Sequence, residues 1–136
     1  MLLLFVTLAL ASTPADVGDW AHSLERPAAG AAASAEGYRF AGAAFAELAE
    51  LAAARPGVVE IERLGTTDSG HPIWAFHVQE PGDETVGSSL VFGGIHALEW
   101  ISVEVAVELL VEVIHRPVPG QRVTVIPLLN LSLIHI

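Results

Sequence analysis

Apolar side chains between residues 38 and 55 recur every three or four positions, while Glu47 and Glu50 fall on the opposite side. This spacing predicts an amphipathic helix, and the Pro56-Gly57 step that follows is a strong stop signal. The apolar positions of this helix are Phe40, Ala44, Phe45, Leu48, Leu51 and Ala52.

The pattern then changes to a period of two. Residues 58–64 alternate apolar and charged side chains, and residues 72–78 form a second segment of strand character. The turn-forming cluster at residues 65–70 separates them, so the two segments predict a β-hairpin. Residues 81–89 are expected to form a polar loop.

Two further apolar segments predict strands with a helix between them. Residues 90–92 are typical of a short strand buried on both faces of a mixed sheet. A second buried strand is expected at residues 122–129, after a turn at residues 117–120. Residues 99–114 are ambiguous, because a stripe of glutamates at four-residue spacing marks a helix while the odd positions are apolar as in a strand.

Length favours the helix, since strands usually have about 5–6 residues. Its glutamate stripe, which consists of Glu104, Glu108 and Glu112, is then expected to be solvated. The order of hairpin, strand, helix and strand predicts an α/β fold with helices packed on a mixed sheet.

The amino terminus has the features of an export signal. Residues 2–10 form an apolar run that is shorter than the roughly 20 residues of a membrane-spanning helix, so no stable membrane anchor is expected. Ala9-Leu10-Ala11 has the small-x-small form that signal peptidases cut. We therefore predict a signal peptide over residues 1–11, with residue 15 as the later end, and a secreted or periplasmic protein cleaved near Ala11. An ordinary buried segment is the alternative, because no Lys or Arg precedes the run.

Composition limits the size of the fold and the kinds of chemistry and partner that are expected. Residues 12–37 are rich in Ala, Gly, Pro and Ser and predict a linker. A length of 136 residues allows one domain at most. A net charge of −10, with six Arg and no Lys, leaves no basic patch for nucleic acid. The absence of Cys excludes disulfides, thiolate metal ligands and a cysteine nucleophile.

The spacing His-x-x-Glu occurs three times, and chance alone supplies such matches in a chain with 6 His. The copy at His22 lies in the predicted linker. The copy at His77 lies in a predicted strand, where residues three apart point to opposite faces. Both histidines are therefore expected to be ordinary surface residues.

The third copy, His96 and Glu99, follows a predicted buried strand and the Gly93-Gly94 step. Glycine allows close backbone approach, and open α/β sheets bind ligands at the carboxyl ends of their strands. An imidazole and a carboxylate suit Zn²⁺ when a third ligand comes from elsewhere. The residues alone leave a second interpretation open, in which Glu99 caps the following helix beside a buried, hydrogen-bonded His96.

Residues 93–102, Gly-Gly-Ile-His-Ala-Leu-Glu-Trp-Ile-Ser, resemble the first metal-binding motif of the zinc carboxypeptidases, the carboxypeptidase A-like metallopeptidases. In that family the motif commonly reads Gly-Gly-x-His-Ala-Arg-Glu-Trp-Ile-Ser. The resemblance extends in order through the first helix, the turn at residues 65–73 and the strand end at residues 125–130. It implies that residues 38–130 are the amino-terminal part of a catalytic domain. The implied fold is a partial mixed-sheet zinc-peptidase (phosphorylase/hydrolase-like) fold, truncated at the C-terminus.

By this resemblance, His96 and Glu99 are the first two zinc ligands. Leu98 stands where the family usually has an Arg that lines the substrate cleft, and His71 replaces the usual Arg of the turn. The family's third ligand, the Arg that binds the substrate's terminal carboxylate, the Tyr that covers the site and the general-base Glu all lie beyond Asn130. The resemblance therefore assigns no catalytic residue to this chain.

The resemblance implies an exported zinc metallocarboxypeptidase that hydrolyses C-terminal residues from peptides or proteins by means of a zinc-activated water. The chain alone is expected to be inactive. One alternative is a zinc deacylase similar to aspartoacylase or succinylglutamate desuccinylase, although Ala97 and Trp100 favour the peptidase. The other alternative is a non-catalytic carboxypeptidase-like binding domain.

Residues 131–136 do not continue the family pattern, in which Pro-Asp-Gly follows the position of Asn130. Leu-Ser-Leu-Ile-His-Ile is the translation of CTG TCT CTT ATA CAC ATC, which resembles a transposon-end adapter used in sequencing libraries. We therefore expect an adapter-derived tail, and a natural hydrophobic strand end is the alternative.

Overall fold

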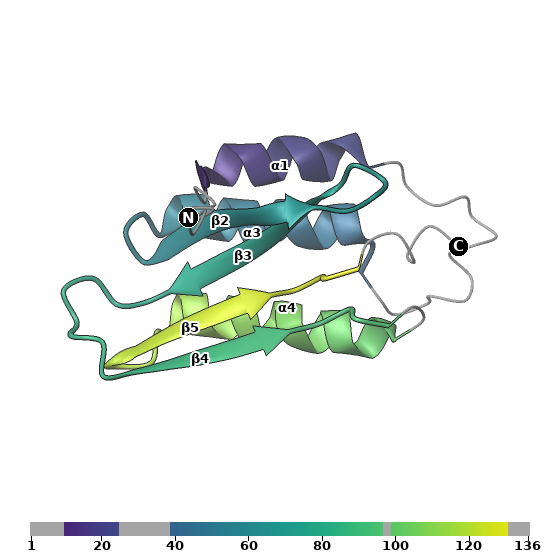
Figure 1. The fold of residues 1–136 in the computed structure, drawn as a ribbon. Coiled ribbons are helices and arrows are strands. Elements are labelled where there is room, and N and C mark those ends of the chain that lie inside the picture. The colour runs from purple at the N-terminus through teal and green to yellow at the C-terminus, as the bar shows by residue number, and fades with distance from the viewer. Residues whose placement is uncertain (1–9, 25–38, 97–98, 131–136) are drawn as a thin grey trace, which may run out of the picture.

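Five strands form one mixed sheet in the spatial order β1-β2-β3-β5-β4 (Figure 1). The computed structural model describes residues 10–24, 39–96 and 99–130. All neighbouring strands run antiparallel except β4 and β5, which are parallel. The strands are β1 (Leu10–Ser12), β2 (Val59–Thr66), β3 (Pro72–Val78), β4 (Gly87–Phe92) and β5 (Gln121–Ile126).

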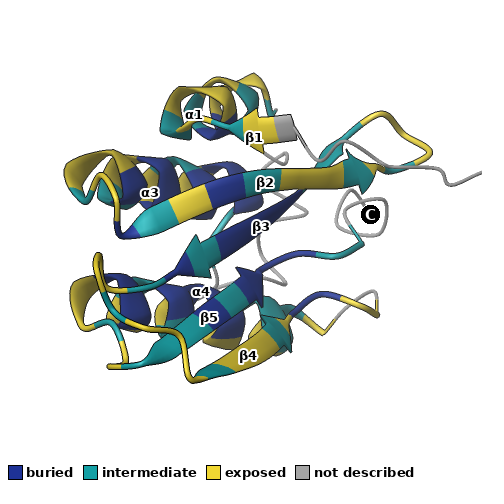
Figure 2. Cartoon of the chain, turned by 60° about the vertical axis from the view of Figure 1, so that its left-hand side comes forward, coloured by how far each residue is buried: buried dark blue, intermediate teal, exposed yellow. Residues whose placement is uncertain are grey.

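Three helices lie on the same face of this sheet (Figures 1 and 2). They are α1 (Pro14–Ser23), α3 (Ala41–Ala54) and α4 (Trp100–His115). Helix α1 packs on α3, α3 contacts α4, and α4 connects the two parallel strands. The structure thus confirms the predicted α/β class with helices on a mixed sheet. None of the helices in the described residues combines the length and the apolar character that a membrane crossing requires.

The hydrophobic core lies between the helices and one face of the sheet. Most of its largest fully buried side chains come from α3, α4, β3 and β5, and α1 adds Val17. Because strand residues alternate between faces, β3 contributes Phe76 and Val78 to this core while His77 points to the other face. The other large members are Phe45, Leu48, Leu110, Ile114 and Val125.

The predicted hairpin is confirmed as β2 and β3. The register pairs Val59 with Val78 and Thr66 with Pro72, and it shifts at a bulge between Arg63 and Gly65. Gly70 has a φ of +86°, a conformation that glycine adopts without steric cost. The hairpin connection is closed by a hydrogen bond of 2.8 Å from the Thr67 amide to the His71 carbonyl.

The linker predicted for residues 12–37 does not hold for residues 14–23, which form α1. Thr13 caps this helix, and Thr13 and Asp16 exchange the reciprocal hydrogen bonds of a capping box. Val17 and Ala21 are buried in the core. Small residues allow α1 to approach α3 closely, so a composition typical of linkers here serves helix packing. The rest of the predicted linker, residues 25–37, lies outside the described residues.

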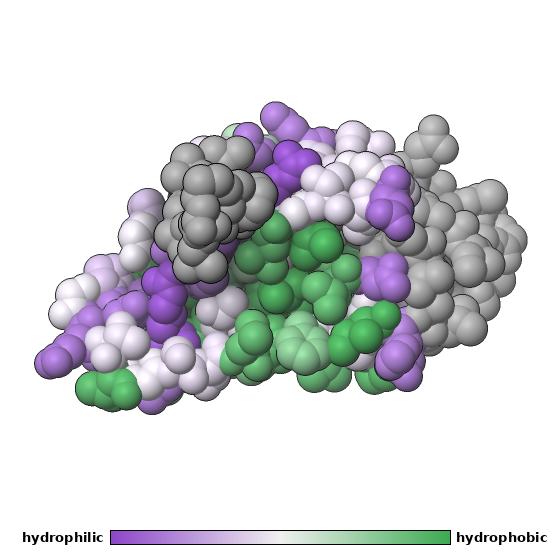
Figure 3. Space-filling view, in the orientation of Figure 1, coloured by the Kyte–Doolittle hydropathy of each residue, from purple (hydrophilic) through white to green (hydrophobic). Residues whose placement is uncertain are grey.

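The prediction that residues 90–92 are buried on both faces is wrong. Leu90 and Phe92 are 60% and 48% exposed. The physical reason is that β4 is an edge strand with a single neighbour, and that no described helix covers this face of the sheet. Figure 3 shows apolar side chains gathered on this open face.

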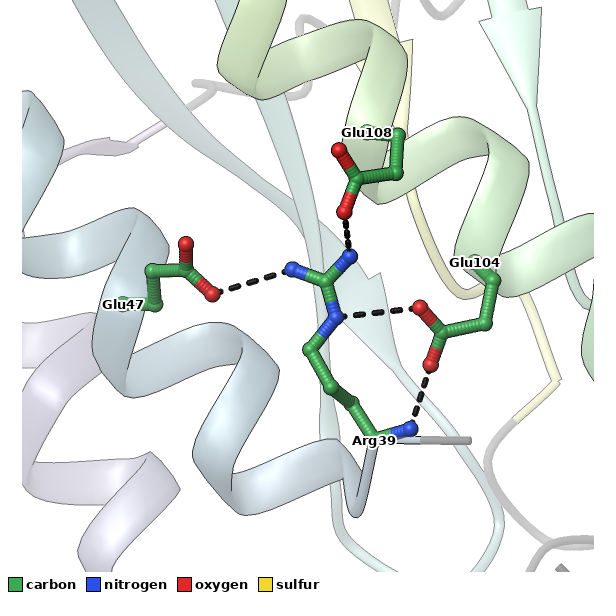
Figure 4. Close-up of polar contacts among 4 residues, drawn as sticks. All are labelled: Arg39, Glu47, Glu104 and Glu108. Atoms are coloured by element: carbon green, nitrogen blue, oxygen red, sulfur yellow. Dashed lines mark hydrogen bonds and ion pairs between the residues drawn. The ribbon is translucent and has the colours of Figure 1, made fainter. Parts of the chain in front are cut away.

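The helix predicted for residues 99–114 is confirmed as α4, but its glutamate stripe is only partly solvated. Arg39, which precedes α3, reaches across to α4 (Figure 4). Its Nε donates to Glu104 Oε2 at 3.0 Å, and Nη1 donates to Glu47 Oε2 at 3.0 Å. Nη2 donates to Glu108, and the Arg39 amide donates to the second carboxylate oxygen of Glu104. One guanidinium therefore connects the first half of α3 to the second and third turns of α4.

Burial of the Arg39 guanidinium disfavours its charged form and acts to lower its pKa. The hydrogen bonds that Arg39 donates to Glu104 and Glu47, together with the charges of Glu104 and Glu108, outweigh this effect and raise the pKa of Arg39. The Arg39 and Glu104 side chains are 26% and 19% exposed, so both are better shielded than an ordinary surface pair. The pair is therefore expected to contribute to stability.

Another ion pair lies on the open face of the sheet. Arg122 Nη2 on β5 donates to Glu60 Oε2 on β2 at 2.8 Å, across the intervening β3. This hydrogen bond lowers the pKa of Glu60 against the opposing effect of burial, and the charges of Arg122 and His77 add to the shift. The pair thus stabilises the ionised carboxylate.

We predict that Arg39→Gln lowers the free energy of unfolding by about 1–3 kcal/mol, because Glu104 then keeps its shielded charge without its cation. Urea denaturation measures the effect. Arg116→Gln is the matched control, since the Arg116–Glu112 pair is 81% and 60% exposed and is expected to contribute less than about 0.5 kcal/mol. Equal losses in the two variants would contradict a special role for Arg39.

We also predict that Arg122→Gln raises the pKa of Glu60 toward its ordinary value of 4.5, as measured by NMR titration of the side-chain carboxyl carbon. A folded pKa below the unfolded one means that the pair stabilises the fold above about pH 4.5 and that this is lost as the pH falls through the lower folded pKa. The contribution is below about 1 kcal/mol because Glu60 is 62% exposed. Arg116→Gln serves again as the control, and an unchanged Glu60 pKa in Arg122→Gln would refute the assignment.

Candidate metal centre

The turn after β4 depends on two glycines that allow three segments to meet. A Cβ on Gly93 would lie 2.5 Å from the Ser102 carbonyl oxygen of α4. A Cβ on Gly94 would lie 2.5 Å from a methyl carbon of Leu128, and Gly94 has a φ of +62°. Both positions therefore require glycine, as the sequence suggested for a sharp turn with close backbone approach.

Hydrogen bonds hold this turn on both sides. The Gly94 amide donates to Ser102 Oγ at 3.0 Å, and Ser102 Oγ donates to the Glu99 carbonyl at 2.7 Å. On the other side, the amides of Leu129 and Asn130 donate to the carbonyls of Gly93 and Gly94, each at 3.0 Å. The start of α4 and the segment after β5 are thus tied to the end of β4.

His96 and Glu99 are both exposed at this turn. Glu99 is the N-cap residue of α4, but its side chain makes no capping hydrogen bond. The interpretation in which Glu99 caps the helix beside a buried His96 is therefore wrong. The two residues between them, which include Leu98, lie outside the described residues.

The donor chemistry of this pair fits part of a zinc site. An imidazole and a carboxylate are both common zinc ligands. The described residues contain no group of three His, Cys, Asp or Glu side chains that could hold a metal ion. The described part of the chain thus offers two ligand types and no complete coordination shell.

The histidines of α1 and α4 do not join this pair. His22 Nδ1 lies 2.7 Å from the Gly18 carbonyl oxygen within α1, and His115 Nδ1 lies 2.9 Å from the Val111 carbonyl oxygen within α4. Each ring is therefore bonded to its own helix. His135 lies outside the described residues.

His77 is not the ordinary surface residue that the sequence predicted. Its side chain is 12% exposed, with Nε2 2.8 Å from Glu62 Oε2 and Nδ1 2.9 Å from Thr124 Oγ1. The partners come from β2 and β5, the strands on either side of β3. The alternation of side chains in the hairpin predicts that Glu62 and His77 lie on one face of the sheet. The contact with Thr124 could not be predicted in this way, because it depends on β5 being the other neighbour of β3.

The chain is similar to known proteins in sequence and in fold. A family model described as zinc carboxypeptidase matches residues 45–130. No curated protein matches the chain significantly.

Two solved structures share the fold. Bovine thrombin-activatable fibrinolysis inhibitor, in complex with tick carboxypeptidase inhibitor, has a TM-score of 0.59 and 18% identity over 68% of this chain and 31% of its own. A crystal structure of thrombin-activatable fibrinolysis inhibitor has a TM-score of 0.57 and 18% identity over 84% of this chain and 31% of its own. The chain thus spans about a third of the length of these structures.

At 18% identity these structures establish the fold alone. The family match is the more specific result, because it covers more than half of the chain and includes the turn with His96 and Glu99. The chain therefore belongs to the zinc carboxypeptidase family.

Proposed function

We propose that this chain is the amino-terminal part of the catalytic domain of an exported zinc metallocarboxypeptidase. The observation that supports this most directly is the exposure of His96 and Glu99 at the carboxyl end of β4, within the segment that matches the family. The two residues lie on one turn that depends on glycine, and they are close in sequence. Both stay accessible, because Glu99 makes no side-chain capping hydrogen bond to α4 and neither residue is part of the buried core.

In this proposal His96 and Glu99 supply two of the protein ligands of a zinc ion. When bound, zinc would supply Lewis-acid polarisation of the scissile carbonyl and acidification of water. The third ligand, the general base and the group that binds the substrate carboxylate belong to sequence beyond Asn130. In this proposal the chain alone is inactive.

The proposed substrate is the carboxyl terminus of a peptide or protein. A zinc deacylase and a non-catalytic binding domain remain the alternatives. Ser102 favours the peptidase, because the Trp-Ile-Ser end of the motif has a structural role here: the Ser102 hydroxyl accepts from Gly94 and donates to the Glu99 carbonyl. The whole motif, with its hydrogen-bonded turn, is thus more specific than the His-x-x-Glu spacing by itself.

For the complete enzyme, we predict that His96→Ala and Glu99→Gln each lower peptidase activity at least ~100-fold and lower the zinc content, because loss of a direct ligand exceeds the effect of losing an outer-shell partner. Hydrolysis of a blocked dipeptide, with and without a chelator, and metal analysis of the purified protein measure the two effects.

His22→Ala and His115→Ala are the matched controls, since each of these imidazoles contacts a carbonyl of its own helix. Full activity in His96→Ala would falsify the proposal. Activity of the unmodified enzyme on an N-acyl amino acid with none on peptides would indicate the deacylase, and zinc binding without either activity would indicate the binding domain.

The export signal is also a proposal, and the structure favours the earlier of its two ends. Cleavage after Ala11 leaves Thr13 and Asp16 to cap α1, whereas cleavage after residue 15 removes the Thr13 cap. Losing a cap costs about 0.5–2 kcal/mol of helix stability. Cleavage after Ala11 still removes part of β1, whose Leu10 and Ala11 pair with Arg63 and Glu62 of β2.

We predict that the exported protein begins at Ser12, as determined by amino-terminal sequencing after expression in a secretory host. Ala11→Gln is expected to block processing, because signal peptidases require a small residue before the cut. Ala15→Gln is the matched control and is expected to be processed normally. Retention of Met1 in a protein that stays inside the cell would refute the export signal.

A further inference from the structure

Strand β4 forms an edge of the sheet that lacks the usual protection against pairing. Among the described strands its neighbour is β5 alone, and Figure 2 shows it along one side of the sheet. Edge strands are commonly very short, charged or interrupted by proline. The opposite edge follows this rule, because β1 has 3 residues and β2 beside it carries Glu60, Glu62 and Arg63. Strand β4 has 6 residues with neither charge nor proline.

The hydrogen bonds to β5 indicate which backbone groups of β4 point outward. The amides of Gly87 and Gly93 donate to carbonyls just before β5 and at its end, and the register between them is unbroken. Successive residues of a strand direct their amide and carbonyl groups to opposite sides. The residues that alternate with these inward-bonded positions, Ser88, Leu90 and Phe92, therefore direct their amides and carbonyls away from β5.

The same residues have their side chains on the open face of the sheet. Leu90 and Phe92 are 60% and 48% exposed, whereas Val91 packs against the core from the helix side. The edge thus offers backbone hydrogen-bonding groups together with apolar surface. This combination is what the addition of a further strand uses.

A second copy of the same strand fits this edge. In an antiparallel pair with a two-fold axis at Leu90, this residue faces its own copy and Ser88 faces Phe92 of the second copy. These are the residues whose amides and carbonyls point outward, so each of them obtains a partner in this register. Other antiparallel registers leave at least one of them without a partner within β4.

Charge also favours contact at β4 over contact elsewhere. A net charge of −10 on each copy opposes their association. Strand β4 is uncharged, and Arg122, which lies opposite Ser88 on β5, already donates to Glu60. Pairing of two β4 strands therefore removes no unpaired charge from water, and salt is expected to strengthen it by screening the overall repulsion.

We propose that two copies of this chain join at β4, as an antiparallel pair centred on Leu90, and form one continuous sheet. Each copy has one such edge, so the association stops at two copies. The inference concerns the chain of 136 residues and is independent of the proposed zinc ligands.

The first test is sedimentation equilibrium of the full chain over a range of concentrations. We expect a dimer with a Kd of about 100 µM or tighter in about 0.5 M NaCl, and a weaker dimer in about 0.05 M NaCl. A chain that stays monomeric at about 500 µM in the higher salt overturns the proposal. Assembly beyond two copies, or association that salt weakens, overturns it as well.

Amide hydrogen exchange locates the contact. The outward amides of Leu90 and Phe92 are expected to exchange more slowly as the protein concentration rises, whereas that of Val91, which faces β5, changes little. Outward amides that exchange freely in the dimer indicate contact through another surface. Outward amides that are protected at every concentration indicate that the same copy covers the edge. Either result overturns the proposal.

Two variants test the register. Leu90→Lys and Leu90→Glu are each expected to weaken the dimer roughly 10-fold, because like charges then face each other at the axis. An equal mixture of the two is expected to associate at least about 3-fold more tightly than either alone, because opposite charges then meet. Leu64→Lys on β2, where the side chain is 44% exposed, is the matched control with the same change in charge and is expected to dimerise normally. Unweakened association in both variants at residue 90, or a mixture no tighter than either alone, overturns the proposal.

Discussion

The close approach of three backbone segments at Gly93 and Gly94 is the constraint on which the candidate site depends. The end of β4 meets the start of α4 on one side and the segment after β5 on the other, at distances that leave no space for a side chain. Protein interiors are close-packed, so one added methyl group here would displace backbone. The same contact places His96 and Glu99 on an exposed turn and aligns α4 with the parallel pair of strands. The same close contact therefore positions both α4 and the two proposed zinc ligands.

The three helices pack on the rest of the fold through different interactions. Helix α3 buries an apolar face against β3, and α4 does the same beside it. Arg39 adds an electrostatic connection between them, because one guanidinium satisfies carboxylates from both helices. Helix α1 lies before the segment that matches the family, yet Val17 and Ala21 are part of the same core. Helix α1 therefore packs in the same unit as the segment that matches the family.

Local patterns in the sequence were sufficient for most elements. The helix at residues 41–54, the hairpin and α4 follow from periodicity, stop signals and length, which act over a few residues. The motif around His96 was also visible, because its glycines are required by local geometry. Other properties depended on distant partners. The exposure of Leu90 and Phe92 follows from the edge position of β4, and the burial of His77 follows from its neighbours on β2 and β5.

The sequence by itself determined the α/β class, the order of the main elements and the family to which the chain belongs. Only the tertiary structure decided that residues 14–23 form a packed helix, that Glu104 and Glu108 pair with Arg39, and that His77 is shielded between β2 and β5. The reason is the range of the forces. Backbone propensity and apolar periodicity are encoded within one turn or strand, whereas burial and ion pairing depend on residues that only folding brings together.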